Sequence, residues 1–244
     1  MTKLNYKFQY EEWHQDTEES RNSDVAASAD FINLHGLWPK NKDANILDVG
    51  CGMGRFLLAF RGNGYANLSG IDVDDYQIGI AKKEGLDVNL VDATKFFGHN
   101  KKHYDLITMI DCLEHIEKDE QVDLLSNINK NLNDGGMLVI RVPNALSPTF
   151  GYFRYIDFTH KLSYTPASLT YLLKNAAFDH ISFRPAWQEN EEIAKLKKPF
   201  AELLKAEFGI DGSILTSNIV VIACKSEKAL HEYLNNAPKL EVKY

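Results

Sequence analysis

Acidic and imidazole side chains gather in two short stretches of the sequence. The first, IDCLEHI, contains Asp111, Glu114 and His115, and the second, YIDFTHK, contains Asp157 and His160. An imidazole titrates near neutral pH and can therefore take a proton from a reacting group. We predict His115, His160 and Asp111 as catalytic residues, with Asp111 expected at the end of a buried strand.

The same residues also fit structural roles. Asp111 and Glu114 are three residues apart, which matches a capping box, in which both side chains bond to backbone N–H groups at a helix start. We therefore interpret Glu114 as a helix cap. His115 would lie in the first turn of that helix, where it either faces a site or packs beneath the N-terminal segment.

An alternation of apolar strands and helices must position these side chains. We predict strands at 46–49, 68–71, 88–91, 106–110, 137–142, 180–184 and 218–225. Helical stretches lie between most of them, at 55–63, 76–84, 120–132 and in YTPASLTYLLKNAAF, where Thr165 caps the helix and Pro166 is its first residue. This rhythm predicts an α/β fold with a Rossmann-like, seven-stranded, mostly parallel sheet, helices on both faces and an N-terminal helical cap.

A glycine-rich turn follows the first predicted strand. ILDVGCGMGRF, residues 46–56, places Gly50, Gly52 and Gly54 two residues apart, behind Asp48. A P-loop would need a Lys and a hydroxyl residue after its last glycine, and neither is present. A dinucleotide fold prefers G-x-G-x-x-G, but Arg55 occupies the position of the third glycine.

Acidic residues also end the next two predicted strands. Asp72 follows the second strand, where it could accept hydrogen bonds from both hydroxyls of a ribose. Dinucleotide enzymes have an acid at a similar distance from the glycines, so Asp72 alone does not decide between cofactors. Asp92 follows the third strand, and a second acid there is much less expected in a dinucleotide enzyme. Each acid could instead be a turn residue.

Residues 44–185 resemble the class I S-adenosylmethionine-dependent methyltransferases. YDLITMIDCLEHI is similar to the family's FDLI…EVLEHI segment, and LNDGGMLVIRVPN to its LKPGGxLxIxxPN, with Asp134 in place of the proline. The resemblance implies S-adenosyl-L-methionine as cofactor, with Asp72 at the ribose and Asp92 at the adenine amino group. The implied cofactor-binding residues are Asp48, Gly50, Cys51, Gly52, Gly54, Asp72, Val73, Asp92, Ala93, Ile110 and Asp111.

The acceptor is expected at the stretch GYFRYIDFTHKLSYT, residues 151–165, which follows the fifth strand at the edge where open α/β sheets bind ligands. Aromatic rings can stack on sugars or hold an amine, and Arg154 and Lys161 could hold a phosphate or carboxylate. The predicted substrate-binding residues are Tyr152, Arg154, Tyr155, Asp157, His160 and Lys161. The alternative is a packed surface loop.

The pattern PN…D-x-T-H also resembles methyltransferases that modify bacterial surface polysaccharide sugars or their precursors. It implies a small polar acceptor, such as a hydroxyl of a sugar, nucleotide sugar or polysaccharide precursor. Alternatives are N-methylation of a small phosphorylated amino alcohol used in capsule biosynthesis, a quinone-type hydroxyl acceptor, and a non-catalytic cofactor-binding partner subunit. Ala177 replaces the glycine usual in the family's AGF segment.

Composition narrows the remaining possibilities. A net charge of −7 argues against a general nucleic-acid binder, and no apolar run is long enough for a membrane span. The three cysteines, Cys51, Cys112 and Cys224, are scattered, which favours a reduced cytoplasmic protein without disulfides. No CxxC or HExxH spacing occurs, so no metal site is expected. A homodimer is possible.

We expect one methyltransferase domain over residues 1–244. It would comprise an N-terminal helical cap (1–42), a cofactor-binding core with the acceptor loop (43–185), a helical insertion (186–217), and the last strand with a polar tail (218–244). Tyr10, Trp13 and His14 are candidates for a lid over the cofactor. We expect Pro199 to break the helical insertion, and LNDGGML to form a turn before the fifth strand.

Overall fold

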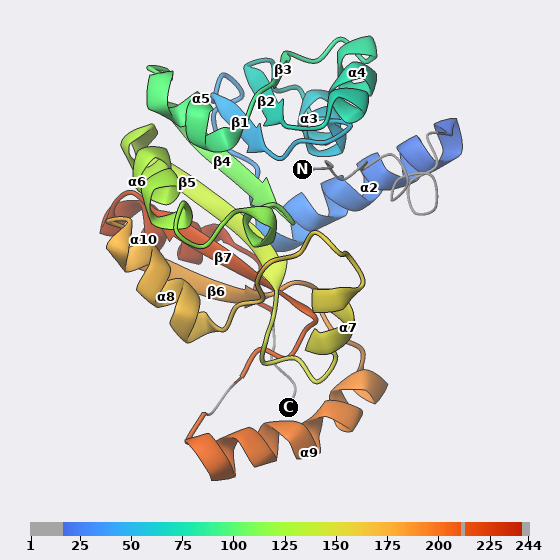
Figure 1. The fold of residues 1–244 in the computed structure, drawn as a ribbon, viewed down its shortest axis with the longest axis vertical. Helices are drawn as coiled ribbons and strands as arrows, with labels where there is room; N and C mark the ends of the chain where they lie inside the picture. The colour runs from blue at the N-terminus through green and yellow to red at the C-terminus, as the bar shows by residue number, and fades with distance from the viewer. Residues whose placement is uncertain (1–16, 211–212, 241–244) are drawn as a thin grey trace, which may run out of the picture.

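A seven-stranded sheet forms the centre of the computed structural model, which describes residues 17–210 and 213–240. Tyr10, Trp13 and His14 lie outside these residues. The strands stand in the order β3-β2-β1-β4-β5-β7-β6 (Figure 1). Their bounds are β1 Ile46–Val49, β2 Leu68–Asp72, β3 Val88–Leu90, β4 Tyr104–Ile110, β5 Leu132–Pro143, β6 His180–Pro185 and β7 Asn218–Cys224.

The strand pairing confirms a mostly parallel sheet. β1 pairs in parallel with β2 on one side and β4 on the other, so that Asp48 lies beside Gly70 and Thr108. β7 runs antiparallel to both β5 and β6. All four residues of β1 are buried, as expected for a strand covered on both faces. The parallel strands β1, β2, β3 and β4 therefore end at the same edge of the sheet.

Helices cover both faces. One face carries α5 (Ala93–His99), α6 (Gln121–Lys130) and α8 (Pro166–Asn175), and the other carries α2 (Glu18–His35), α3 (Arg55–Gly62) and α10 (Glu227–Asn236). Neighbouring residues of β1 face opposite sides of the sheet. Leu47 packs in the core under α5, α6 and α8, and Ile46 packs in the core under α2, α3 and α10. α4 (Asp75–Lys83) packs beside β3 and α3.

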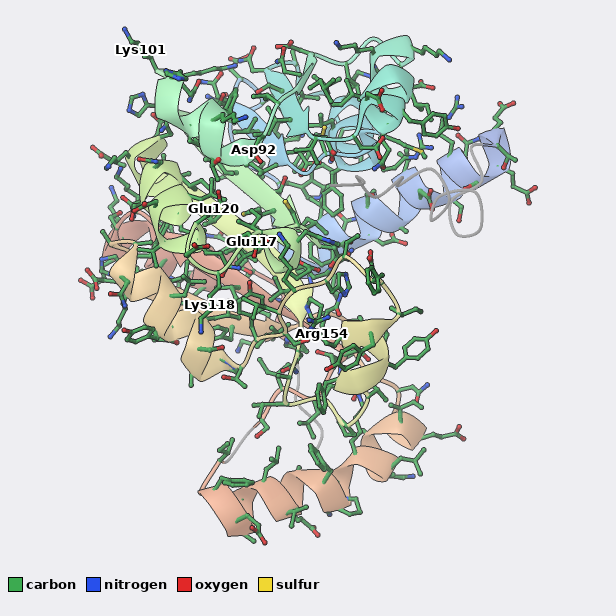
Figure 2. The ribbon with its side chains drawn as sticks, viewed as in Figure 1. Asp92, Lys101, Glu117, Lys118, Glu120 and Arg154 are labelled. Carbon is green, nitrogen blue, oxygen red and sulfur yellow. The ribbon has the colours of Figure 1, made fainter. Side chains whose placement is uncertain are left out.

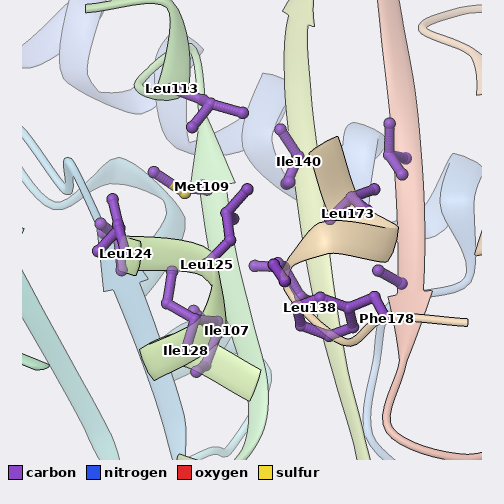
Figure 3. Close-up of a cluster of buried hydrophobic side chains, with 14 of the residues drawn as sticks. Ile107, Met109, Leu113, Leu124, Leu125, Ile128, Leu138, Ile140, Leu173 and Phe178 are labelled. Atoms are coloured by element: carbon purple, nitrogen blue, oxygen red, sulfur yellow. The ribbon is translucent and has the colours of Figure 1, made fainter. Parts of the chain in front are cut away.

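A cluster of buried hydrophobic side chains lies between β4, β5, α6 and α8 (Figure 3). Ile107 and Leu138 of the sheet lie with Leu125 and Leu173 of the helices, and none of the four is exposed to solvent. Thr165 caps α8 as predicted, because its hydroxyl accepts a hydrogen bond from Ser168 N. Packing of α6 and α8 against this face of the sheet holds the end of β4 in place. The catalytic candidates follow directly after β4 in the sequence.

A buried imidazole joins α2 to the far end of the sheet. Arg184 of β6 donates from Nε to Nδ1 of His35, so that Nδ1 is the acceptor and Nε2–H donates to the carbonyl of Ala186. Burial lowers the pKa of His35 to about 4, helped by the positive charge of Arg184 and opposed by the Ala186 carbonyl. His35 is therefore a neutral structural residue at neutral pH.

Three local expectations were wrong. α9 (Glu191–Phe208) continues through Pro199, and it lies away from the sheet at the bottom of Figure 1. Because α9 is mostly exposed, water can bond the carbonyl that a proline leaves without a donor. Residues 132–138 belong to β5, with a register shift against β4, and form no separate turn. The expected polar tail contains α10, whose Tyr233 is buried against the sheet.

None of the described helices is long and apolar enough to cross a membrane.

Candidate active site

A cavity of about 690 Å³ opens at the sheet edge where β1, β2, β3 and β4 end. Its volume lies within the range of small-molecule sites. The loop after β1 and the residues after β2 and β3 line one end, while η1 (Leu113–His115) and the loop at 157–161 line the other. α2 contributes Asp24, Ala27, Ser28 and Phe31 to the wall. The predicted glycine loop and the predicted acceptor loop thus meet in one cavity.

The glycine loop turns tightly at the first end. Gly50 and Gly52 have φ values of 74° and 51°, which favour glycine. A Cβ on Gly50 would lie 2.8 Å from Cys112 Sγ, and one on Gly52 would lie 2.7 Å from Gln77 Oε1. Gly54, predicted as a cofactor contact, does not line the cavity. It is the N-cap of α3, and a Cβ there would lie 2.2 Å from Leu86 Cδ1, so its role is packing.

Asp72 is held in place by the backbone at the end of β2. Its Oδ2 accepts a hydrogen bond from Gly52 N at 2.8 Å, and its Oδ1 accepts one from Asp74 N at 2.9 Å. Burial raises the pKa of Asp72, and these N–H groups oppose the shift. Each carboxylate oxygen has a second lone pair, so the orientation allows further bonds to two adjacent hydroxyls.

Asp48 is buried at the end of β1. Its Oδ1 accepts a hydrogen bond from Thr108 Oγ1 at 2.6 Å. Burial raises the pKa of Asp48 to about 7, the Thr108 hydroxyl lowers it, and the charge of Asp72 raises it further. Burial and the neighbouring charge of Asp72 both favour a proton on Asp48.

Asp92 caps α5, a role that differs from the turn residue considered as its alternative. Its Oδ1 accepts hydrogen bonds from the backbone and hydroxyl of Thr94 and from Lys95 N. Asp92 and Ala93 also line the cavity, together with Val73 and Cys51. The contact of Asp92 with an adenine amino group therefore stays a prediction.

Asp111 is not a helix cap. It has a φ of 51°, unusual for a residue other than glycine, and its backbone N–H bonds to the carbonyl of Arg141. Arg141 holds the Asp111 carboxylate with two donors, and Asn218 Nδ2 lies 3.3 Å from the same group. Burial lowers the pKa of Arg141, but the charge and hydrogen bonds of Asp111, together with the charge of Glu114, raise it overall. A carboxylate held in this way has a fixed orientation and can orient neighbouring groups.

Glu114 departs most from expectation. The capping role was wrong, because η1 has no side-chain cap and the Glu114 side chain is fully buried. Neither of its carboxyl oxygens has a hydrogen-bond partner among the described residues. Burial, reinforced by the charge of Asp111, raises the pKa of Glu114 well above its usual range.

His115 is oriented by a chain of hydrogen bonds from the acceptor loop. Thr159 Oγ1 donates to Asp157 Oδ1 at 2.6 Å, because an ionised carboxylate can only accept. The Thr159 hydroxyl must therefore accept from His115 Nδ1–H, at 2.8 Å. This leaves Nε2 of the neutral ring unprotonated. Burial and the neighbouring His160 lower the pKa of His115.

His160 has the same tautomer for a similar reason. Its Nδ1 lies 2.8 Å from the carbonyl oxygen of Phe153, which can only accept, so the proton is on Nδ1. Its Nε2 lies 3.9 Å from Glu114 Oε1 and 3.8 Å from Asp157 Oδ2. The rings of His115 and His160 are 4.7 Å apart, and both line the cavity. The two imidazoles and the Glu114 carboxyl group thus form one small cluster.

The predicted substrate residues separate into two groups. Asp157, His160 and Lys161 line the cavity, whereas Tyr152, Arg154 and Tyr155 lie on α7 (Phe150–Tyr155) outside its wall. Tyr152 and Tyr155 are exposed, since this short helix has no buried residue. Figure 2 shows Arg154 on α7, apart from Asp92, Glu117 and Glu120.

Both predicted phosphate ligands already have partners within the chain. Arg154 donates to the carbonyl of Lys161 at 2.7 Å and stacks over the ring of Tyr155. Lys161 Nζ pairs with Glu117 Oε1 at 2.8 Å.

Sequence reasoning missed several cavity residues. Arg141 interrupts the apolar run LVIRVPN, and a cation within a buried strand signals an ion-pair partner. Arg55 and Gln77 reach the wall from α3 and α4, and Phe31 reaches it from α2. No local motif marks these three residues, because packing of the helices brings them to the cavity.

Comparison with known proteins agrees with this geometry. Residues 21–183 match the model of a methyltransferase domain family. A ubiquinone biosynthesis O-methyltransferase of Rickettsia prowazekii is 26% identical over 200 residues, covering 80% of this chain and 77% of the relative. A SAM-dependent methyltransferase from Archaeoglobus fulgidus has a similar structure, with a TM-score of 0.67, 22% identity, and coverage of 90% and 99% of the two chains. The plantazolicin methyltransferase BamL, solved with SAH, has a TM-score of 0.58 at 18% identity, with 90% of each chain covered.

The chain belongs to the methyltransferase domain family. It is an S-adenosylmethionine-dependent methyltransferase, and its seven-stranded Rossmann-like sheet matches solved members of that class. The described residues also fit the cofactor, because a tight glycine turn, an oriented acid at the end of β2 and a cavity of suitable volume lie together.

Proposed function

We propose that the protein methylates a hydroxyl oxygen of a small polar acceptor, namely a sugar or a polysaccharide precursor. The observation that carries this proposal is the pair His115 and His160, whose rings are oriented through Nδ1 and line the cavity that also contains the glycine loop. A hydroxyl must lose its proton as its oxygen accepts a methyl group, so basic nitrogen atoms are needed beside it.

The two ends of the cavity have separate roles in this proposal. Asp72 accepts hydrogen bonds from the ribose, and Asp92 lies towards the adenine. When bound, S-adenosylmethionine supplies an electrophilic methyl group on a sulfonium centre. Asp111, fixed by Arg141, orients the acceptor, and the imidazole pair accepts the hydroxyl proton. Holding the acceptor in line supplies much of the rate acceleration.

The carboxylates around the acceptor end favour a hydroxyl-rich group at this end of the cavity. Glu117, Glu120 and Asp157 line that end, and carboxylates accept hydrogen bonds from sugar hydroxyls. Arg154 and Lys161, the cations predicted to bind a phosphate group, already contact the Lys161 carbonyl and Glu117. These contacts argue against a phosphorylated amino alcohol as acceptor.

A phenolic hydroxyl is the second candidate. The four curated relatives that match are ubiquinone biosynthesis O-methyltransferases of Rickettsia species, and two of these matches extend over 80% and 79% of this chain. A phenol loses its proton more readily than a sugar hydroxyl and would use the same imidazole pair.

An acceptor panel tests the proposal. Purified protein is incubated with labelled S-adenosylmethionine and with nucleotide sugars, free sugars, catechols or phosphoethanolamine, and the methylated atom is located by mass spectrometry and NMR. We expect methylation of a sugar oxygen. Methylation of a catechol alone would select the second candidate, and methylation of nitrogen would contradict the proposal. Retained cofactor binding without turnover on any acceptor would indicate a non-catalytic subunit.

A further inference from the structure

The acceptor end contains a group of side chains that acid–base chemistry does not fully explain. One ring nitrogen each of His115 and His160 and one carboxylate oxygen of Glu114 lie within 4.8 Å of one another. Accepting a hydroxyl proton takes one imidazole, so that role alone does not account for all three side chains. The arrangement therefore calls for a ligand that uses all three side chains.

Glu114 gives the strongest sign of a missing partner. Its side chain is 1% exposed, and both carboxyl oxygens lie without a hydrogen-bond partner among the described residues. An unsatisfied buried carboxyl group costs folding free energy, and an unpaired buried charge costs more. A cation beside Glu114 would remove this cost.

The distances fit coordination of a single ion. His160 Nε2 lies 3.9 Å from Glu114 Oε1. Ligand atoms that each bind one ion at about 2.1 Å can be up to about 4.2 Å apart. A small closure of the three side chains would bring the remaining separations, up to 4.8 Å, into the same range.

The hydrogen bonds behind the two imidazoles match those of metal-binding histidines. Such a histidine donates its second N–H to a carbonyl, carboxylate or water, which fixes the tautomer and the ring orientation. His160 donates from Nδ1 to the carbonyl of Phe153. His115 donates from Nδ1 to the Thr159 hydroxyl, which in turn donates to Asp157. The remaining nitrogen of each ring keeps its lone pair for an ion.

We propose that Glu114, His115 and His160 bind one divalent cation at the acceptor end of the cavity. Two imidazoles with one carboxylate favour a first-row transition metal, such as Mn²⁺, Fe²⁺, Co²⁺ or Zn²⁺, over Ca²⁺. Asp157 Oδ2, 3.8 Å from His160 Nε2, is close enough to interact with the ion or with its bound water. Three protein ligands leave coordination positions open to the cavity.

The role of the ion rests on the proposed function, whereas its binding does not. An acceptor hydroxyl bound at an open position would become more acidic, because the positive charge stabilises the alkoxide. The histidines would then act through the ion, and a second oxygen on the acceptor could bind beside the first. Such a site suits vicinal hydroxyls, which occur in sugars and in catechols.

Calorimetric titration of EDTA-treated, dialysed protein with Mn²⁺ and with Zn²⁺, without cofactor or acceptor, tests the proposal. We expect about one ion to bind per chain, and Glu114→Gln or His160→Gln to weaken binding at least tenfold. Glu117→Gln is the matched control, because Glu117 lines the same cavity but pairs with Lys161. Its metal affinity should equal that of the unchanged protein.

Thermal unfolding separates a lost ligand from a lost fold. Glu114→Gln removes an unpaired buried acid, so the metal-free variant should unfold at the same or a higher temperature. Absence of binding at millimolar metal, or equal affinity in Glu114→Gln, would overturn the metal site. Metal binding without methylation of any hydroxyl would retain the site and reject the proposed function. If EDTA-treated protein that binds no metal methylated a hydroxyl, the proposed function would be retained and the metal site would be rejected.

Discussion

The two ends of the cavity are built by different kinds of contact. At the cofactor end, Asp92 bonds to Thr94, and Asp72 bonds to Asp74 and to the preceding turn at Gly52. At the acceptor end, His115 depends on Thr159, 44 residues away in the sequence. The first end is therefore encoded largely in local turns and strand ends. The second forms only when the loop after β5 packs against η1.

The comparison suggests a division of function. Residues 46–56 resemble the glycine turn of related proteins. In such a turn, fixed backbone N–H groups hold the cofactor in the same way from one protein to the next. A long-range cluster can change its acceptor when the loop changes. Substitutions at one end should therefore alter cofactor affinity, and substitutions at the other should alter turnover. The predictions below test that separation, beginning with the largest expected effect.

Asp72→Ala should weaken binding of the demethylated cofactor about 100-fold or more, because two hydrogen bonds from a carboxylate contribute about 1.5 kcal/mol or more each. Isothermal titration measures the affinity, and thermal unfolding checks the fold. Asp75→Ala, at an exposed position in the first turn of α4, is the control. Equal affinity in Asp72→Ala would remove this residue from the cofactor site.

Thr159→Val should lower kcat about tenfold and leave cofactor affinity unchanged, because His115 loses the hydroxyl that fixes its tautomer. Thr94→Val provides the matched change at the cofactor end, where the hydroxyl bonds to Asp92. It should raise the KM for the cofactor and leave kcat nearly constant. If both variants changed the same kinetic constant, the two ends would not be functionally separate.

His35→Gln should reduce the pH dependence of stability between pH 4 and 6.5. The pKa of His35 is about 4 in the folded chain, against 6.5 ordinarily. Below pH 6.5 the unfolded chain binds a proton that the folded chain does not, so stability falls as pH drops through this window. The loss should reach about 3 kcal/mol.

Urea unfolding at several pH values gives the free energy of unfolding of the unchanged protein and of His35→Gln. The contributions of the other titrating groups cancel in the difference between the two. A difference in unfolding free energy that stayed constant from pH 4 to 6.5 would contradict the shifted pKa of His35. Turnover at neutral pH should change little, because His35 lies outside the cavity wall.

Ala177→Gly should stabilise the protein by about 0.5–1 kcal/mol. Ala177 has a φ of 64°, where an alanine is strained, and glycine relieves the strain at some cost in unfolded-state entropy. Ala176→Gly, at a negative φ one residue earlier, should instead destabilise it. Chemical denaturation measures both variants, and a destabilising Ala177→Gly would contradict the assigned backbone conformation.

The sequence predicted the features that depend on local order. All seven strands and the cap at Thr165 were confirmed, because apolar runs and turn residues determine them directly. Gly54 was assigned to the cofactor from its spacing, whereas tertiary packing against Leu86 determines its role. Pro199 was expected to end a helix, but an exposed helix can lose one backbone hydrogen bond to water and continue.

The acceptor end was harder to predict because its contacts join distant segments. Glu114 matched a cap by spacing, and only the packed fold shows it buried near His160. Arg154 and Lys161 were expected to bind phosphate, but their partners, the Lys161 carbonyl and Glu117, could not be identified from local sequence. The spacing of residues in the sequence indicates which residues share a helix or strand. It does not indicate which side chains from different elements contact one another.

The separation of the two ends is tested most directly in the double variant His115→Ala/His160→Ala. Its affinity for the demethylated cofactor is measured by calorimetry, and its turnover on the acceptor identified in the panel is measured in parallel. The account predicts cofactor affinity within about twofold of the unchanged protein and turnover reduced at least 100-fold. Full turnover in this variant would contradict the central claim that these imidazoles carry out the acceptor chemistry.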